Sequence, residues 1–191
     1  MKLIDFRLPE GGFEQPLQLW QACHDRVVRM VNILVRLHEH VGLNGPDPAA
    51  RVTVESLRRF FDEALPRHHE DEEVDLFPCI DRGLHKRPDS ESRQIAATLE
   101  ELRADHRDMA AMWRTLRTPL QELEAGRAAT IDPGTLSLFE HRNRRHAELE
   151  ERHLTPVLAS ALSATDLERI GHSMAQRRGL TWGDLGRPPV F

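Results

Sequence analysis

The chain is poor in the residues from which sheets are usually built. Its 191 residues include no tyrosine and only 5% aromatic residues, whereas 30% are charged. This balance is typical of long amphipathic helices rather than of strands, which favour aromatic and β-branched side chains. We therefore expect an all-α protein, and the length suits a single domain over residues 1–191.

Cysteine and long apolar runs are also scarce. Cys23 and Cys79 are the only cysteines, and they form no CxxC pair, which excludes a disulfide framework and a thiolate metal site. We expect them to be reduced thiols. No apolar run approaches the length of a membrane span, and the amino-terminal segment lacks the apolar core of a signal peptide. A soluble cytoplasmic protein is therefore expected.

The overall charge is mildly negative. The chain has 31 acidic residues against 26 lysines and arginines, which gives a net charge of -5. This balance offers no electrostatic reason to bind nucleic acid or an anionic membrane, so we expect neither partner. The sequence has no feature that fixes the oligomeric state.

Three stretches rich in proline and glycine divide the chain into long segments. These breaks lie at about residues 42–51, 82–90 and 125–134. The segments between them are expected to be helices at about residues 16–41, 53–80 and 92–124, with a fourth that begins at Asp132 and Pro133. Because the connections are short, we expect an up-down-up-down antiparallel four-helix bundle over about residues 15–162.

The C-terminal extension, residues 163–191, is expected to add a short fifth helix. This helix is predicted to start at Thr165, because Glu168 three residues later completes a capping box. An irregular C-terminal tail is expected after it, from about Gly179.

Two prolines fall inside predicted helices. Pro66 lies in the second helix and Pro119 in the third. Each removes a backbone donor and crowds the preceding turn, so we expect a kink or a local break at both positions.

Histidine is abundant, with eleven in the chain, and it is the commonest metal ligand in proteins. Each predicted helix places histidine or glutamate on an otherwise apolar stripe, whose residues recur at steps of three and four. These residues are His24 on the first helix, His68 and Glu72 on the second, His106 on the third, and His146 and Glu150 on the fourth.

The second and fourth helices carry the same motif. Residues 68–78 (HHEDEEVDLFP) and 146–156 (HAELEERHLTP) both read HxExEExxLxP. Residues four apart share one face of a helix, so each motif points an imidazole and a carboxylate into one pocket. A single histidine precedes each motif by 44 and 40 residues, respectively. The chain therefore reads as an internal duplication of a helix with His followed by a helix with HxxxE.

All six side chains are expected to meet at one level of the bundle. Counted from the connecting loops at about 1.5 Å per residue, their heights on neighbouring helices agree to within one turn. Buried carboxylates need a cation, and mixed imidazole and carboxylate ligands suit iron, manganese or zinc. Six ligands are too many for one tetrahedral zinc ion, whereas two carboxylates are able to bridge a pair of metals. We favour two iron ions, with zinc or manganese as alternatives.

The pattern H, HxxxE, H, HxxxE resembles the hemerythrin-like, or HHE, family, and particularly its bacterial branch. The resemblance covers the four bundle helices and rests on the doubled HxxxEE, with leucine and proline at fixed offsets. It implies a di-iron centre, with or without an oxo bridge, inside an up-down bundle. The residues it assigns are His24 and His68 to one iron, His106 and His146 to the other, and Glu72 and Glu150 as bridges.

The chain departs from the invertebrate oxygen-carrying hemerythrins at one position. Those proteins have a further histidine one turn from the third-helix ligand, whereas Leu102 and Ala110 flank His106 here. Simple reversible oxygen carriage is therefore not our expectation. The pattern is more similar to the di-iron domain of the iron-sulfur cluster repair proteins, although their cysteine-bearing amino-terminal extension is absent.

With two histidines and two carboxylate oxygens on each iron, both ions would keep an open position. This predicts binding of a small ligand such as dioxygen, nitric oxide or peroxide, in sensing, storage or a stress response. Two other classes remain open, namely an enzyme that detoxifies peroxide or nitric oxide or repairs iron-sulfur clusters, and a structural or iron-handling bundle. No acid-base group beyond the ligands stands out, so no catalytic residue is assigned.

The remaining histidines and glutamates are given other roles. His69 and Glu73 form a competing HxxxE pair one residue out of register, and we expect them to be solvated. His38 is expected to pack at the end of the bundle, and His153 to pack or to support a ligand. The residues expected at the surface are His40, His85, His141, His172, Glu70, Glu148 and Glu151.

Overall fold

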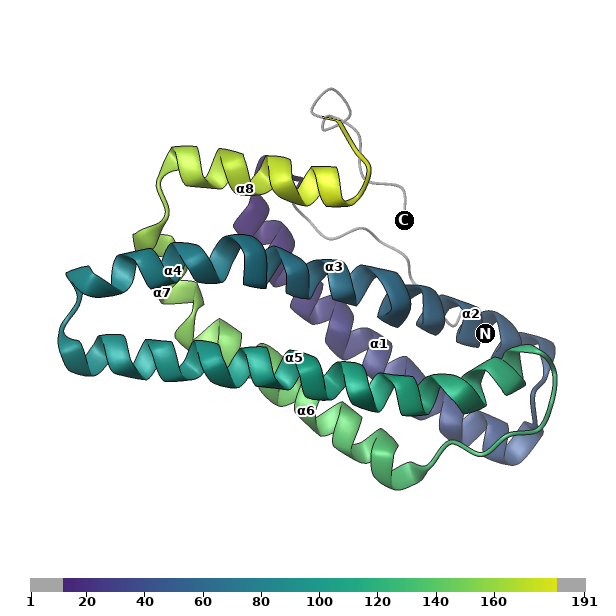
Figure 1. Cartoon of the computed structure of the whole chain (residues 1–191). Helices are drawn as coiled ribbons and strands as arrows, with labels where there is room; N and C mark the ends of the chain where they lie inside the picture. Colours follow the sequence, from purple (N-terminus) through teal and green to yellow (C-terminus); the bar gives the residue numbers. More distant parts are fainter. Residues whose placement is uncertain (1–11, 182–191) are drawn as a thin grey trace.

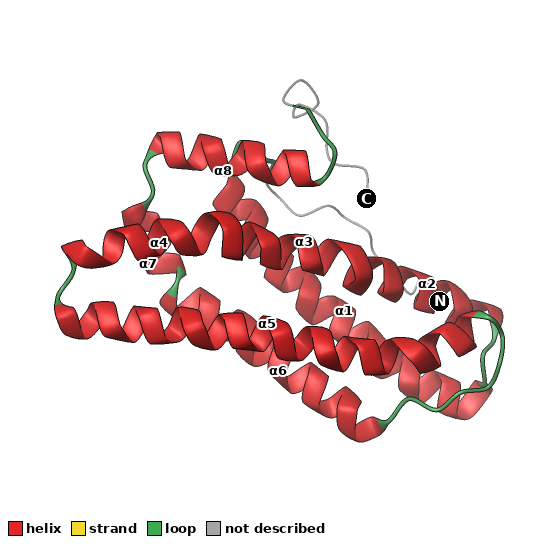
Figure 2. Ribbon diagram, viewed as in Figure 1, coloured by secondary structure: helices red, strands yellow, loops and turns green. Residues whose placement is uncertain are grey.

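A computed structural model describes residues 12–181, and within this range the chain is helical apart from its connections (Figure 2). No β-strand occurs among these residues. None of the helices in the same range is both long enough and apolar enough to cross a membrane. The expected all-α fold class is therefore confirmed.

Four long helical stretches and one C-terminal helix make up the described chain. The first and third stretches are the single helices α1 (Pro16–Asn44) and α5 (Asp89–Glu124). The second stretch comprises α2 (Pro48–Arg59), the π-helix η1 (Phe60–Ala64), α3 (Leu65–Glu70), the π-helix η2 (Asp71–Leu76), α4 (Phe77–Gly83) and the 3-10 helix η3 (Leu84–Lys86). The fourth comprises α6 (Pro133–His153) and α7 (Thr155–Ala161), and α8 (Ala164–Arg177) follows it.

The four stretches pack side by side as an antiparallel bundle (Figure 1). Contacts join α1 to α2, α2 to α5, α5 to α6 and α6 back to α1, so each stretch has two neighbours. The C-terminal helix α8 lies across the outside of this bundle, where it contacts α1 and η2. The observed bundle with an additional short helix therefore confirms the predicted arrangement.

Aspartate caps begin two of the helices. Asp132 accepts a hydrogen bond from the backbone N–H of Thr135 at 2.6 Å, and Pro133 is the first helical residue, as predicted. Asp47 plays the same part for α2 by accepting from the N–H of Ala50 at 2.7 Å. Because Pro48 directly follows this cap and suits the first turn of a helix, α2 begins at Pro48, five residues before the predicted start at about residue 53.

The fifth helix begins slightly earlier than predicted. Its cap is Ser163, and Asp166 completes the capping box in place of Glu168. The predicted capping box had made Thr165 the cap, so the start is wrong by two residues. The irregular tail predicted after this helix falls mostly on residues 182–191, which lie outside the described residues.

The prolines inside the helices are accommodated in two ways. Both π-helices end two residues before a proline, η1 before Pro66 and η2 before Pro78. Proline cannot donate to the carbonyl four residues back and its ring crowds that carbonyl, and a wider π turn relieves this crowding while the chain stays helical. Pro119 lies within α5, which continues to Glu124. The predicted local break at Pro119 is wrong, because the carbonyl that loses its partner belongs to the exposed residue Thr115.

A polar layer divides the core of the bundle into two apolar clusters. One cluster includes Val27, Leu34, Phe61, Leu65, Met109, Trp113 and Phe139. The other includes Trp20, Leu76, Phe77, Leu102, Leu154, Val157 and Ile170. Along each long stretch the chain passes from one cluster to the other, and the buried histidines and glutamates fall in the interval. The two clusters therefore enclose these polar side chains on both sides.

The contact of α8 with the start of the described chain requires glycine at position 171. A Cβ atom on Gly171 would lie 2.0 Å from the backbone oxygen of Phe13, which is itself buried. We predict that Gly171→Ala lowers the free energy of unfolding by about 1–3 kcal/mol through this overlap, measured by urea denaturation.

The matched control for this substitution is Gly42→Ala in α1. A Cβ atom there meets no other atom within 4 Å, so alanine should leave stability unchanged or raise it by up to about 1 kcal/mol. Equal stability of Gly171→Ala and the unaltered protein would contradict the close contact.

Candidate metal centre

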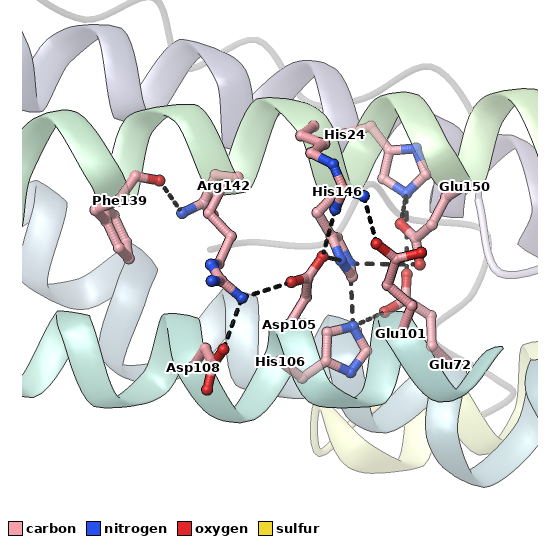
Figure 3. A network of polar contacts seen from close by, with 12 residues as sticks. His24, Glu72, Glu101, Asp105, His106, Asp108, Phe139, Arg142, His146 and Glu150 are labelled. Carbon is pink, nitrogen blue, oxygen red and sulfur yellow. Dashed lines mark hydrogen bonds and ion pairs between the residues drawn. The ribbon is translucent and has the colours of Figure 1, made fainter. Parts of the chain in front are cut away.

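The polar layer brings together all six side chains singled out from the sequence. A first group, with donor atoms within 4.8 Å of one another, consists of His24, His68, Glu72 and Glu150. A second group, by the same measure, consists of His69, Glu72, His106 and His146. Because Glu72 belongs to both, the two groups adjoin. All four long helical stretches contribute to them, and Figure 3 shows several of these side chains converging between the helices.

Two glutamates lie between the groups and direct one oxygen toward each. Glu72 Oε1 is 3.0 Å from His68 Nε2, and its Oε2 is 3.2 Å from His106 Nε2. Glu150 Oε2 is 3.0 Å from His24 Nε2. Its Oε1 is 3.5 Å from His146 Nε2, in the second group. This arrangement suits two carboxylates that bridge a pair of cations.

Both glutamates are completely buried, yet their hydrogen bonding is incomplete. Glu72 and Glu150 are 0% exposed. Within the described part of the chain, neither oxygen of Glu150, nor Oε2 of Glu72, nor either ring nitrogen of His24 has a hydrogen-bond partner. A buried ionised carboxylate is strongly unfavourable unless it is paired or binds a metal. The orphaned donor atoms therefore fit metal ligation.

The buried glutamates of the two groups favour a positive charge in the polar layer. Burial by itself lowers the pKa of His24, but Glu150 and Glu72 outweigh it and raise this pKa from 6.5 to about 9. Burial by itself raises the pKa of Glu72, but His68 and His106 hold it well below the ordinary 4.5. A divalent cation supplies the same compensation while the histidines remain neutral.

His69 lies in the second group, so the expectation that it is solvated is wrong. Its ring stacks on that of His106, with 3.9 Å between the centroids. Consecutive residues on a helix point about 100° apart, so His68 and His69 face different groups. Burial and the neighbouring His106 lower the pKa of His69 well below 6.5, which keeps its imidazole neutral. In the sequence, the feature that indicates this arrangement is the pair of consecutive histidines, His68 and His69.

Two further buried residues contact the groups and were not identified from the sequence. The indole N–H of Trp20 donates to Glu72 Oε1 at 2.6 Å. Asp105, which is 3% exposed, accepts from Arg142 at 2.7 Å and places its other oxygen 3.7 Å from Nδ1 of His146 (Figure 3). Because Asp105 lies on the flank of the apolar stripe of α5, periodicity did not distinguish it from a solvated acid.

Arginines in and directly after α8 hold the π-helix η2 in place, and η2 carries Glu72, which belongs to both groups. Arg177 donates to Asp71 and to Asp75, each at 2.6 Å. Arg178 donates to Asp71 at 2.7 Å, and Arg169 to Asp75 at 3.1 Å. Both aspartates are buried, so these contacts compensate two charges beside the polar layer.

The other histidines lie outside both groups. On α1 the buried stripe passes through Leu37, which leaves His38 half-buried. His153 is half-buried at the end of α6. His40 is hydrogen-bonded to Asp47 at 2.9 Å. The exposed histidines are His85, His141 and His172, as predicted.

Comparison with known proteins identifies the class of protein. The model of the hemerythrin HHE cation binding domain matches residues 15–158. The chain therefore belongs to the hemerythrin HHE cation-binding family, whose helical bundles bind metal ions, typically iron. It is similar to an uncharacterized protein of Haemophilus influenzae, with 30% identity over 166 residues that cover 87% of this chain and 91% of that protein. The similarity to iron-sulfur cluster repair proteins stays a prediction.

The link between α8 and η2 is testable through Arg177, which is 12% exposed. We predict that Arg177→Met lowers the free energy of unfolding by about 2–3 kcal/mol, because it leaves Asp71 and Asp75 with fewer charged partners in a buried setting. Thermal or urea denaturation measures this change.

The control is Arg127→Met, which removes an exposed ion pair with Glu122. Exposed pairs contribute about 0–1 kcal/mol, so this variant should unfold almost like the unaltered protein. Equal effects of the two substitutions would show that the buried aspartates do not depend on Arg177.

Proposed function

We propose that this protein holds two iron ions in its polar layer and binds a small ligand there, such as dioxygen, nitric oxide or peroxide. The proposed ligands are His24 and His68 for one ion, His69, His106 and His146 for the other, and Glu72 and Glu150 as bridges. The observation that carries the proposal is the pair of completely buried glutamates, each with one oxygen near each group.

The donor set supports a transition metal. Imidazole and carboxylate together suit iron, manganese or zinc, whereas calcium and magnesium prefer oxygen ligands alone. Iron is favoured because the family typically binds it, and manganese and zinc are the alternatives. When bound, iron would supply a redox change and an open coordination position for the ligand.

The two groups differ in their number of imidazoles, and this difference supports binding of the small ligand at the first group. That group has two imidazoles and the second has three, so the first leaves more room around its cation. A small pocket of about 40 Å³ adjoins the first group, and Trp20, Cys23 and His68 line it. A volume above roughly 10–15 Å³ admits a water molecule, so this pocket suits a ligand of a few atoms. Leu19 and Phe60 make part of its lining apolar, which suits a neutral gas.

The proposed setting is the cytoplasm, in sensing, storage or a stress response. The test is to load the purified protein with ferrous iron without air, to measure iron content, and to follow the absorption spectra of separate samples as nitric oxide, dioxygen or peroxide is added. We expect two iron ions per chain and a spectral change that is reversed when the gas is removed.

The outcome also distinguishes the alternatives. Protein that stays colourless and binds no iron would contradict the proposal. Steady turnover of nitric oxide or peroxide by the loaded protein would indicate an enzyme. Two iron ions with no response to any of the three ligands would indicate a structural or iron-handling bundle.

The part assigned to His69 has its own test. We predict that His69→Ala weakens the binding of one of the two metal ions by at least about tenfold and leaves the other nearly unchanged, because His69 offers a donor atom to the second group alone. Competition with a coloured chelator measures both affinities.

His141→Ala is the matched control, since His141 is exposed on α6. It should leave both affinities unchanged. If His69→Ala does the same, the second ion is held by two imidazoles and His69 only packs against it.

A further inference from the structure

Each copy of the duplicated motif has, directly after its bridging glutamate, another glutamate that the proposed ligand set does not use. In the first copy this residue is Glu73, whose Oε1 lies 2.6 Å from His106 Nδ1. In the second copy it is Glu151, whose Oε1 lies 3.7 Å from His24 Nδ1. The two glutamates are 42% and 55% exposed, so they stand between the centre and solvent. Glu151 is exposed as expected, whereas the expectation that Glu73 is only a solvated acid is wrong, because it is hydrogen-bonded to His106.

The Glu73–His106 and Glu151–His24 contacts occupy equivalent positions in the two halves of the duplicated chain. Glu73 belongs to the first copy and faces the single histidine that precedes the second copy. Glu151 belongs to the second copy and faces the single histidine that precedes the first. The same exchange between halves occurs twice, at positions one residue after each bridging glutamate. A chance contact of a surface acid would have no reason to recur in this way.

The ring nitrogens give the contacts a chemical meaning. In both histidines Nε2 faces the centre, since His106 Nε2 is 3.2 Å from Glu72 and His24 Nε2 is 3.0 Å from Glu150. A neutral imidazole carries its proton on one nitrogen only, and the hydrogen bond made by that nitrogen decides which. A carboxylate that accepts from Nδ1–H leaves the lone pair of Nε2 free to bind a metal and makes that nitrogen a stronger donor.

We propose that Glu73 and Glu151 are positioning residues, which fix the orientation and the tautomer of His106 and His24 for metal binding. This inference rests on the proposed metal centre. Glu73 makes a direct hydrogen bond, whereas the 3.7 Å separation of Glu151 suits a weaker effect through charge or an intervening water. Asp105 lies beside Nδ1 of His146 as these glutamates lie beside Nδ1 of His106 and His24, but it belongs to α5 and not to the motif.

The experiment compares Glu73→Ala, Glu73→Gln and Glu151→Ala with the control Glu148→Ala, an exposed glutamate of the second copy. The metal is cobalt(II), and chelator competition gives the affinity of each site. We expect Glu73→Ala to weaken binding at one site by roughly 10–100-fold, and Glu151→Ala to weaken the other by less. Glu73→Gln should restore part of the loss, because its amide oxygen still accepts a hydrogen bond. Glu148→Ala should change neither affinity.

A second measurement separates positioning from a general loss of stability. In the cobalt-loaded protein, NMR detects the exchangeable imidazole N–H signals of the ligands, which the nearby ion shifts out of the crowded region. We expect the His106 signal to exchange slowly in the unaltered protein, to vanish in Glu73→Ala and to return in Glu73→Gln. Melting temperatures should stay close to that of the unaltered protein, because both glutamates are partly exposed.

The outcomes distinguish this inference from the proposed function. If the unaltered protein binds no cobalt and no iron, the metal centre is wrong and the inference falls with it. If the unaltered protein binds two ions and Glu73→Ala binds them with equal affinity and an unchanged His106 signal, the centre stands and the positioning role is wrong.

Discussion

Two carboxylates enclosed by an apolar core are the constraint on which the structure depends. Glu72 and Glu150 are completely buried, and in such a setting an ionised carboxylate needs a nearby positive charge or a metal. The bundle meets this need by directing imidazoles at them from all four long helical stretches. The apolar residues then pack as two clusters on either side of the polar layer, which keeps water away from it.

The helix backbone is adapted to the same layer. The π-helix η2 carries Glu72 and Glu73, and a π turn changes the angular positions of the residues along it. The turn lies two residues before Pro78, so the proline of the motif and the altered helix geometry belong together. On the outer side of η2, the arginines of α8 compensate Asp71 and Asp75. The segment that contributes Glu72 to both groups thus has charged partners both inside the bundle and on its outer side.

Much of the fold and of the site could be predicted because both follow from simple spacing. Steps of three and four residues place Leu99, Leu102, His106 and Met109 on one face of α5, and all four are buried. The repeated HxxxE spacing identified the glutamates and their histidines because residues four apart share a face. The single-domain assignment of residues 1–191 remains a prediction from length.

What could not be predicted depends on contacts between helices rather than on spacing within one. His69 and Glu73 lie off the stripe of their own helix, and only the position of α5 makes them neighbours of His106. Trp20 packs in an apolar cluster, and nothing in its spacing along the sequence shows that its indole N–H meets Glu72. The cap of the fifth helix was missed by two residues because Ser163 and Thr165 are both acceptable caps from sequence alone.

The exchange between the two halves of the chain has a consequence for its origin. The first group takes His24, His68 and Glu72 from the first half and Glu150 from the second, whereas the second group takes two side chains from each half. If the two halves arose by duplication, a single helix pair could not have completed either group by itself and would have needed a second copy of itself, arranged about a twofold axis. The halves are no longer equivalent, because His69 of the first copy has alanine at the equivalent position 147 of the second.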